Sequence, residues 1–233
     1  METVTIARRY NGPPDSGNGG YSCGVLGVRL GDCAEVRLRM PPPLDVPLGL
    51  EQRGDALVAL HDDAVVAEAR AATLDLEVPD PVGFEDAVTA AKSFFVESEH
   101  PFPLCFVCGP ARAPGDGLRI FSGHTHTENV LAAPWVPDAT IARDGVVAPE
   151  FLWAALDCPS GHGAFAQGEG RTMNILLGTL RAQIHAPVNV GEQCVVLGWG
   201  LGVEGRKYYG GSAVFGEDGT LRARAHAVWI QLR

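Results

Sequence analysis

Two cysteines three positions apart form the motif whose residue types and spacing could most directly do chemistry. Cys105-x-x-Cys108 could supply two thiolates to a zinc ion, with His124 and His126 as the remaining ligands. However, His-x-His is narrower than the usual spacing of a second ligand pair, and no second Cys pair follows. No strand–helix–strand pattern of a redox domain surrounds the motif. We therefore interpret Cys105 and Cys108 as small buried thiols in a tight turn, and we expect no metal ion and no cofactor.

Two further kinds of catalytic machinery are missing from the sequence. The glycine-rich segment Gly161–Gly170 lacks the Gly-Lys-Ser/Thr ending and the strand context of a phosphate-binding loop. No Ser-His-Asp arrangement and no nucleophile-elbow motif appears either. The sequence therefore argues against a phosphate-binding loop and against a serine nucleophile.

The charge balance of the chain restricts its partners. Its 233 residues carry a formal net charge of −10, from 18 Lys and Arg against 28 Asp and Glu. The basic residues are scattered, with adjacent pairs only at Arg8–Arg9 and Arg206–Lys207, so nucleic acid and anionic membranes are unfavourable partners. No apolar run is long enough to cross a bilayer, and Met1–Tyr10 has no apolar core of the signal-peptide kind. We expect a cytoplasmic protein whose six cysteines stay reduced.

The first third of the chain predicts a loop, a helix and four strands. Asn11–Gly20 contains four glycines and two prolines, which is typical of a loop. Tyr21–Leu30 is an apolar stretch of helical length. Four β-like runs follow, the first of which alternates strictly between polar and apolar residues: Ala34–Met40, Leu48–Gln52, Ala56–Leu60 and Ala64–Thr73.

The rest of the chain repeats this plan after a different kind of segment. Glu77–His100 contains a helical pattern over Phe84–Val96, which predicts a helical connector. A short apolar helix is expected over Glu150–Asp157, followed by a loop of small residues over Cys158–Gly170. The expected strands around this helix are Leu118–Phe121, Asn129–Trp135, Met173–His185, Gln193–Gly202, Lys207–Phe215 and Leu221–Leu232.

Two copies of a loop, a central helix and a four-strand meander are therefore visible. Their closing hairpins match loosely, with His61–Leu74 corresponding to Gly216–Trp229. Because an antiparallel sheet needs one face covered, and one long helix can cover it, each copy predicts a helix wrapped by a sheet. The sequence thus predicts an α+β fold of two paired repeats, residues 1–76 and 105–233, joined by the connector 77–104.

Three segments of the second repeat resemble a known family. Cys105–Phe121 (CFVCGPARAPGDGLRIF) resembles the opening segment of hotdog thioesterases of the phenylacetate-degradation type, and Asp144–Asp157 resembles their helix. Met173–Glu192 resembles the long strand after that helix. The first repeat is similar to the N-terminal repeat of double-hotdog acyl-CoA thioesterases, through the glycine pair before its helix. The resemblance implies two hotdog repeats that form a pseudo-dimer.

The resemblance also implies what a catalytic site would need. Hotdog thioesterases use a carboxylate on the central helix, as general base or nucleophile, and a backbone N–H at a helix start that polarises the thioester carbonyl. The helix start is usually His-Gly-Gly, about two turns before the carboxylate. The first repeat has Asn18-Gly19-Gly20 but no carboxylate two turns on. The second repeat has Asp157 but no glycine pair before it.

Each repeat has thus kept one half of the family's site, which implies a single composite site between the repeats. Asp157 would act as base or nucleophile, and the N–H of Gly20 or of Gly19 would bind the oxyanion. Asn18 would fix the loop or the acyl carbonyl, and Thr179 on the following strand would position water. A structural interpretation stays open, in which Asp157 bonds to amides of the turn after it and the glycines form a flexible turn.

The function implied by the resemblance is hydrolysis of an acyl-CoA or a similar acyl thioester, with the acyl chain in a tunnel between the repeats. Three alternatives stay open: a non-catalytic acyl-CoA-binding protein, a hotdog dehydratase or hydratase, and an interaction module. A dehydratase needs a catalytic His near a helix start, and neither helix start has one. A homodimer fits any of these functions, since double-hotdog units often assemble through sheet edges.

Overall fold

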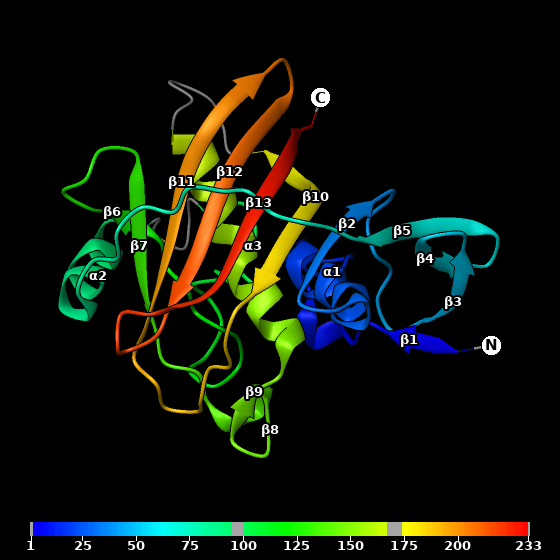
Figure 1. Cartoon of the computed structure of the whole chain (residues 1–233), viewed down its shortest axis with the longest axis horizontal. Coiled ribbons are helices and arrows are strands. Elements are labelled where there is room, and N and C mark those ends of the chain that lie inside the picture. Colours follow the sequence, from blue (N-terminus) through cyan, green and yellow to red (C-terminus); the bar gives the residue numbers. More distant parts are fainter. Residues whose placement is uncertain (1, 95–99, 167–173, 233) are drawn as a thin grey trace.

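The computed structural model describes residues 2–94, 100–166 and 174–232, where eleven strands form one antiparallel sheet (Figure 1). The order across this sheet is β1-β3-β4-β5-β2-β10-β13-β12-β11-β7-β6. The first half contributes β1 (Thr3–Thr5), β2 (Cys33–Leu38), β3 (Pro47–Arg53), β4 (Ala56–His61) and β5 (Ala64–Ala71). The second half contributes β6 (Gly123–His124), β7 (Val130–Trp135), β10 (Ile175–Ile184), β11 (Cys194–Glu204), β12 (Lys207–Phe215) and β13 (Leu221–Gln231). A separate small pair is β8 (Ala142–Arg143) and β9 (Val146–Val147).

The two halves of the sheet join where β2 pairs with β10. Ala34 lies opposite Ala182, and Val36 lies opposite Leu180, in antiparallel register. All four side chains are fully buried. The apolar core is therefore continuous from one repeat to the other, and it is stabilised because this surface is removed from water.

The two central helices pack directly against each other. Helix α1 (Gly19–Gly27) contacts helix α3 (Pro149–Ala166), which also lies against β11 and β12 (Figure 1). A Cβ atom added at Gly20 would lie 2.4 Å from the Cβ of Asp157, and one added at Gly27 would lie 2.4 Å from the Trp153 ring. Glycine is a poor helix former. It is used here because a larger side chain would not fit between the two helices.

Most predicted elements are confirmed within a few residues, and so is the α+β class. The helix predicted over Tyr21–Leu30 begins two residues earlier as α1 and ends in a 3₁₀ turn, Val28–Leu30. The helix predicted over Phe84–Val96 is shorter in the structure. Helix α2 (Phe84–Ala90) is followed by a 3₁₀ turn, and residues 95 and 96 lie outside the described residues. None of the described helices is long and apolar enough to cross a membrane. The boundaries after residues 76 and 104 stay a prediction.

The predicted strand Leu118–Phe121 is wrong. Arg119 has a φ of 54°, which an extended strand does not allow. The backbone N–H of Leu118 donates to the carbonyl of Phe106 (2.8 Å), and the N–H of Ile120 donates to the carbonyl of Val107 (2.9 Å). The segment therefore packs on the turn between Cys105 and Cys108, and β6 takes its place at the edge of the sheet.

The loop predicted over Cys158–Gly170 is wrong as far as Ala166, because α3 continues to that residue; the remainder lies outside the described residues. The glycines that suggested a loop are positions of close packing. A Cβ added at Gly161 would lie 2.8 Å from the Trp229 ring, and one added at Gly163 would lie 2.3 Å from the backbone nitrogen of Trp199. Small residues let the helix touch the sheet here.

We predict that Gly24→Ala destabilises the protein by about 1–3 kcal/mol, the usual range for overpacking a core. A Cβ at this position would lie 2.8 Å from both the carbonyl oxygen of Glu150 and the Cβ of Trp153. The loss should appear although alanine favours a helix over glycine by about 1 kcal/mol. Urea titration gives the free energy of unfolding. Gly83→Ala is the control, because Gly83 is exposed and its added Cβ would meet only the Asp86 carboxylate. Unchanged stability of Gly24→Ala would contradict this account of the helix contact.

Candidate active site

Asn18 connects the start of α1 to the middle of α3. As the N-cap of α1, its Oδ1 accepts a hydrogen bond from the backbone N–H of Tyr21 (2.9 Å). Its Nδ2 donates to Oδ2 of Asp157 (2.7 Å). An amide side chain has both an acceptor and donors, so one residue can cap its own helix and bind a carboxylate on the other. The first half of the chain therefore meets the second half at these two side chains.

Asp157 is a buried carboxyl group that is only partly satisfied. The residue is 2% exposed, and this burial raises the pKa of its carboxyl group to about 7. The Gly20 N–H and the Asn18 amide oppose this rise, whereas negative charge on Cys105 adds to it. The Gly20 N–H is near enough to stabilise the charge, yet Oδ1 has no partner in hydrogen-bond geometry among the described residues. One carboxylate oxygen is thus held and the other is available.

The two glycines after Asn18 have different surroundings. Gly20 lies against Asp157, as its lack of room for a Cβ indicates. Gly19 lines the cavity beside the side chain of Leu177. In the part of the chain that the structure describes, the Gly19 N–H has no hydrogen-bond partner. Because the first N–H groups of a helix carry partial positive charge, the Gly19 N–H is suited to bind an oxygen atom in the cavity.

A cavity of about 240 Å³ lies in front of Asn18 and Asp157. It is enclosed by the loop before α1, the end of β2, the middle of α3 and the start of β10. Its apolar wall includes Ile175, Leu177 and Trp229, and its lining reaches the surface of the protein at the exposed residue Met40. The cavity is thus mainly apolar, with a carboxyl group and a helix start at one position of its wall.

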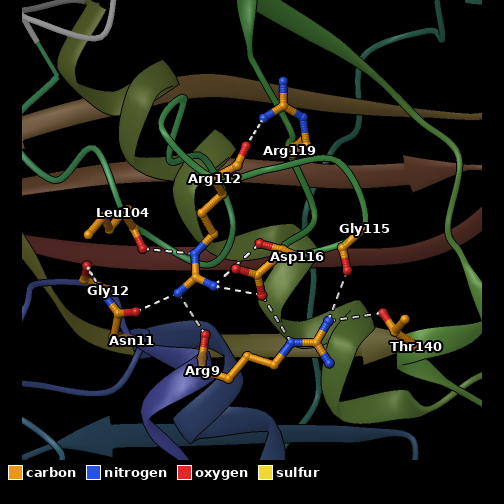
Figure 2. A network of polar contacts seen from close by, with 9 residues as sticks. All are labelled: Arg9, Asn11, Gly12, Leu104, Arg112, Gly115, Asp116, Arg119 and Thr140. Carbon is orange, nitrogen blue, oxygen red and sulfur yellow. Dashed lines mark hydrogen bonds and ion pairs between the residues drawn. The ribbon is translucent and has the colours of Figure 1, made fainter.

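A polar network holds the loop that precedes α1 (Figure 2). The Arg112 guanidinium, which is buried, donates to the carbonyls of Leu104 (2.9 Å) and Arg9 (2.7 Å) and also to the side chain of Asn11. Figure 2 shows Asn11 between this guanidinium and the carbonyl of Gly12. These charge-assisted hydrogen bonds tie the cavity-lining loop to the segment that carries Cys105 and Cys108.

Five more buried side chains line the same cavity: His100, Cys105, Cys108, Cys158 and His162. The Sγ atoms of Cys105 and Cys158 are 3.7 Å apart, and Sγ of Cys108 is 3.4 Å from Nε2 of His100. Cys105 is 3.9 Å from Nδ2 of Asn18, which places the cluster beside the carboxyl group. His124 and His126, the ligands considered with Cys105 and Cys108, are exposed and do not belong to the cluster.

The hydrogen bonds within the cluster have opposite effects on the pKa values of its three thiols. Hydrogen bonds from Cys108 and then from Cys158 lower the pKa of the Cys105 thiol well below its usual range. The same bonds raise the pKa of the Cys108 and Cys158 thiols. Burial lowers the pKa of His162 to about 3, so its ring is neutral at ordinary pH.

Four of the five residues predicted for a composite site lie together in the structure, namely Asn18, Gly19, Gly20 and Asp157. Thr179 does not join them. It lies on β10 between Arg37 of β2 and Val228 of β13, just after a register shift at Gly178, and it is outside the cavity lining. Its predicted role in positioning water has no geometric support.

The sequence analysis missed His100, Cys158 and His162. A signal was present, because Cys158 and His162 are four positions apart and therefore lie on one face of a helix. The prediction of a loop after Asp157 concealed it. His100 lies within the predicted connector 77–104, five positions before Cys105, and no spacing in the sequence links it to the Cys-x-x-Cys motif.

We predict that Asp157→Asn raises the melting temperature at pH 8 by roughly 10 °C, since a folded pKa about three above the ordinary value corresponds to about 4 kcal/mol, and each kcal/mol shifts the melting temperature by about 2–4 °C. The folded pKa of about 7 exceeds the ordinary value of 3.8, so the wild type loses stability as pH rises through this interval. At about pH 3, below both pKa values, the carboxyl group is protonated in the folded and the unfolded state, so the two proteins should melt together there. Asp63→Asn, in an exposed turn, is the control. A wild type that is the more stable at pH 8 would favour the structural interpretation of Asp157.

Comparison with solved structures finds likenesses over the whole chain. The tesB protein of Mycobacterium avium subspecies paratuberculosis has a TM-score of 0.61 at 13% identity, covering 100% of this chain and 96% of that one. A proposed thioesterase II from Thermobifida fusca YX has a TM-score of 0.61 at 14% identity, covering 100% and 97%. A proposed thioesterase from Novosphingobium aromaticivorans has a TM-score of 0.56 at 10% identity, covering 99% of this chain and 95% of that one. No protein-family model and no curated protein matches the chain. The chain therefore has the double-hotdog fold of these structures, and the resemblance seen in its sequence is confirmed for the fold.

Proposed function

We propose that this protein hydrolyses an acyl thioester of the acyl-CoA kind at one composite site between its two repeats. The observation that carries the proposal is the 2.7 Å hydrogen bond from Asn18, at the start of α1, to the buried carboxyl group of Asp157 on α3. The pair lies in the wall of a mainly apolar cavity. The full-length likeness to two structures described as proposed thioesterases adds support.

Asp157 would activate the attacking group. Asn18 holds Oδ2, so Oδ1 can accept a proton from water while the water oxygen attacks the thioester carbonyl carbon. The tetrahedral intermediate then breaks its C–S bond, and the proton passes to the leaving sulfur to give a free acid and a thiol. Oδ1 could instead attack the carbonyl carbon directly and expel the thiolate to form an anhydride. Water would then hydrolyse the anhydride to the free acid and the Asp157 carboxylate, and the released proton would pass to the thiolate. The geometry is compatible with either course.

Gly19 is a better candidate for the oxyanion donor than Gly20. The Gly20 N–H faces the Asp157 carboxyl group, whereas Gly19 lines the cavity at the positive end of α1. A preorganised N–H donor in such a position stabilises the negative oxygen of the transition state. The carbonyl oxygen would therefore lie at Gly19, with its carbon facing Asp157.

We predict that Asp157→Asn lowers thiol release at least about a hundredfold, the scale of general acid–base catalysis. The assay uses acyl-CoAs with short, long and aromatic acyl groups, and Asp63→Asn is again the control. Turnover by Asp157→Asn close to that of wild type would remove Asp157 from the mechanism. Thermal stabilisation by one acyl-CoA without turnover would point to a binding protein instead.

The same panel tests the dehydratase or hydratase alternative, which the structure makes more relevant because His100 and His162 line the cavity. A 2-enoyl-CoA is therefore included, and its hydration is followed by loss of the conjugated absorbance. Hydration without thiol release would contradict the proposed hydrolase.

We predict that Gly19→Pro abolishes most turnover, with a loss of roughly 100–1,000-fold, while Gly19→Ala retains much more. Both variants add a Cβ that would lie 2.8 Å from Cδ2 and 2.9 Å from Cβ of Leu177, so they share this crowding, but only proline removes the N–H. Proline is tolerated at the first position of a helix, and Asn18 already has the extended ψ of 132° that precedes proline. Circular dichroism checks that both variants fold. Equal activity of the two variants would assign the oxyanion to another donor.

We predict that Arg39→Ala raises KM for an acyl-CoA roughly two- to fivefold, the size of a partly exposed charge contact. Arg39 lines the cavity near its exposed rim and is paired with Glu68 (2.6 Å), so a CoA phosphate would share its charge. A short N-acetylcysteamine thioester lacks phosphates, and its KM should not change. Arg37→Ala, two positions away on β2 and outside the cavity lining, is the control. An equal change in KM for both substrates would mean that Arg39 does not contact the carrier.

A further inference from the structure

The proposed hydrolysis leaves unexplained why sulfur and imidazole donors gather in the cavity wall. The Sγ atoms of Cys105, Cys108 and Cys158 all lie within 4.8 Å of one another. A ring nitrogen of His162 lies within 4.8 Å of the Cys108 sulfur. Within the described residues these groups contain only nitrogen and sulfur donors, which Zn²⁺ and similar thiophilic ions prefer.

We propose that four of these residues bind one thiophilic divalent cation of the Zn²⁺ kind: Cys105, Cys108, Cys158 and His162. A tetrahedral ion with Zn–S of about 2.3 Å and Zn–N of about 2.0–2.1 Å requires donor separations of roughly 3.4–3.8 Å. The 3.7 Å between Cys105 and Cys158 already meets this requirement. The Cys108 sulfur lies within 4.8 Å of both, and the His162 ring, which lies within 4.8 Å of Cys108, must move toward the other two sulfurs to close the site.

The backbone of both ligand pairs suits such a site. Cys105 and Cys108 belong to a turn closed by a hydrogen bond from the Gly109 N–H to the Cys105 carbonyl (2.9 Å). A Cβ at position 109 would lie 2.5 Å from that carbonyl oxygen, so the turn requires glycine. Cys158 and His162 are one helical turn apart on α3. A Cys-x-x-Cys turn facing an i, i+4 pair on a helix is a common arrangement of structural zinc ligands.

His100 would orient a ligand without being one. Its Nδ1 accepts a hydrogen bond from the backbone N–H of Phe102 (3.1 Å). A neutral imidazole that accepts at Nδ1 carries its proton on Nε2, and Nε2 lies 3.4 Å from Sγ of Cys108. The ring therefore donates to that sulfur, as groups behind a metal-bound thiolate commonly do.

The ion would have a structural task and a route of entry. All four ligands line the cavity, so an ion can reach them from its open side. Four protein ligands leave no position for water or substrate, which separates this ion from the thioester chemistry. It would fasten the Cys105–Cys108 turn to α3 immediately after Asp157. The proposal does not depend on hydrolysis, because its test measures metal binding without substrate.

The test is a titration of the reduced, chelator-treated full-length protein with Co²⁺, after counting of its six thiols. We expect one equivalent to bind with the thiolate-to-cobalt and tetrahedral d–d absorption bands, and Zn²⁺ to displace it. Zn²⁺ at about 100 times its dissociation constant should raise the melting temperature by roughly 5–10 °C.

Variants identify the ligands. Cys158→Ser should weaken Co²⁺ binding more than about a hundredfold, whereas His100→Gln should weaken it about ten- to a hundredfold without changing the absorption bands. Cys194→Ser, at a buried thiol on β11 outside the cluster, is the matched control and should bind as wild type does. The absence of cobalt bands in fully reduced wild type would overturn the proposal, as would unchanged binding in Cys158→Ser. Two fewer free thiols in the untreated protein, without metal, would indicate a disulfide and also overturn it.

Discussion

The contact between α1 and α3 is the constraint on which the rest of the structure depends. Gly20, Gly24 and Gly27 face α3 at intervals of four and three residues, the spacing of one helix face. A side chain at any of these three positions would clash with α3. Glycine therefore lets the backbones of α1 and α3 pack closely, until α1 touches the buried Trp153 ring. The start of α1 then falls at the level of Asp157. The contact that unites the two repeats thus also brings Asn18 to the carboxyl group.

The residue at position 18 also affects how basic Asp157 can be. The related helix starts that the sequence resembles usually carry histidine here, which can become positively charged. A positive charge at hydrogen-bond distance would stabilise the carboxylate and lower the pKa of Asp157 strongly. Asparagine supplies a similar donor without a charge, so burial remains the dominant effect and the pKa rises to about 7. Asn18 therefore positions the carboxyl group without the lowering of its pKa that a charged residue would cause.

The repeats and the class of fold were within reach of the sequence, and the family resemblance placed the Asn18-Gly19-Gly20 segment opposite Asp157, but the direct hydrogen bond from Asn18 to Asp157 was not predicted. Strict alternation identified strands such as β2, and the composite arrangement followed from what each repeat lacks. The Arg112 network and the closeness of His100 to His162 were beyond reach, because both join segments far apart in the chain. Arg119 could not be recognised as a strand breaker either, since its positive φ is unusual for a residue other than glycine.

The second half of α3 shows how one error can hide a group of residues. Small residues and Pro159 are typical of a loop in a single sequence, but here Gly161 and Gly163 are small because Trp229 and Trp199 occupy the space beside them. Once the helix is extended, Asp157 and Cys158 are consecutive positions about 100° apart around its axis. One faces the start of α1, and the other faces the Cys105 sulfur. A single rigid element therefore sets the geometry of both groups. A closed ion site at Cys158 would fix the wall of the cavity while leaving the chemistry to the carboxyl group beside it.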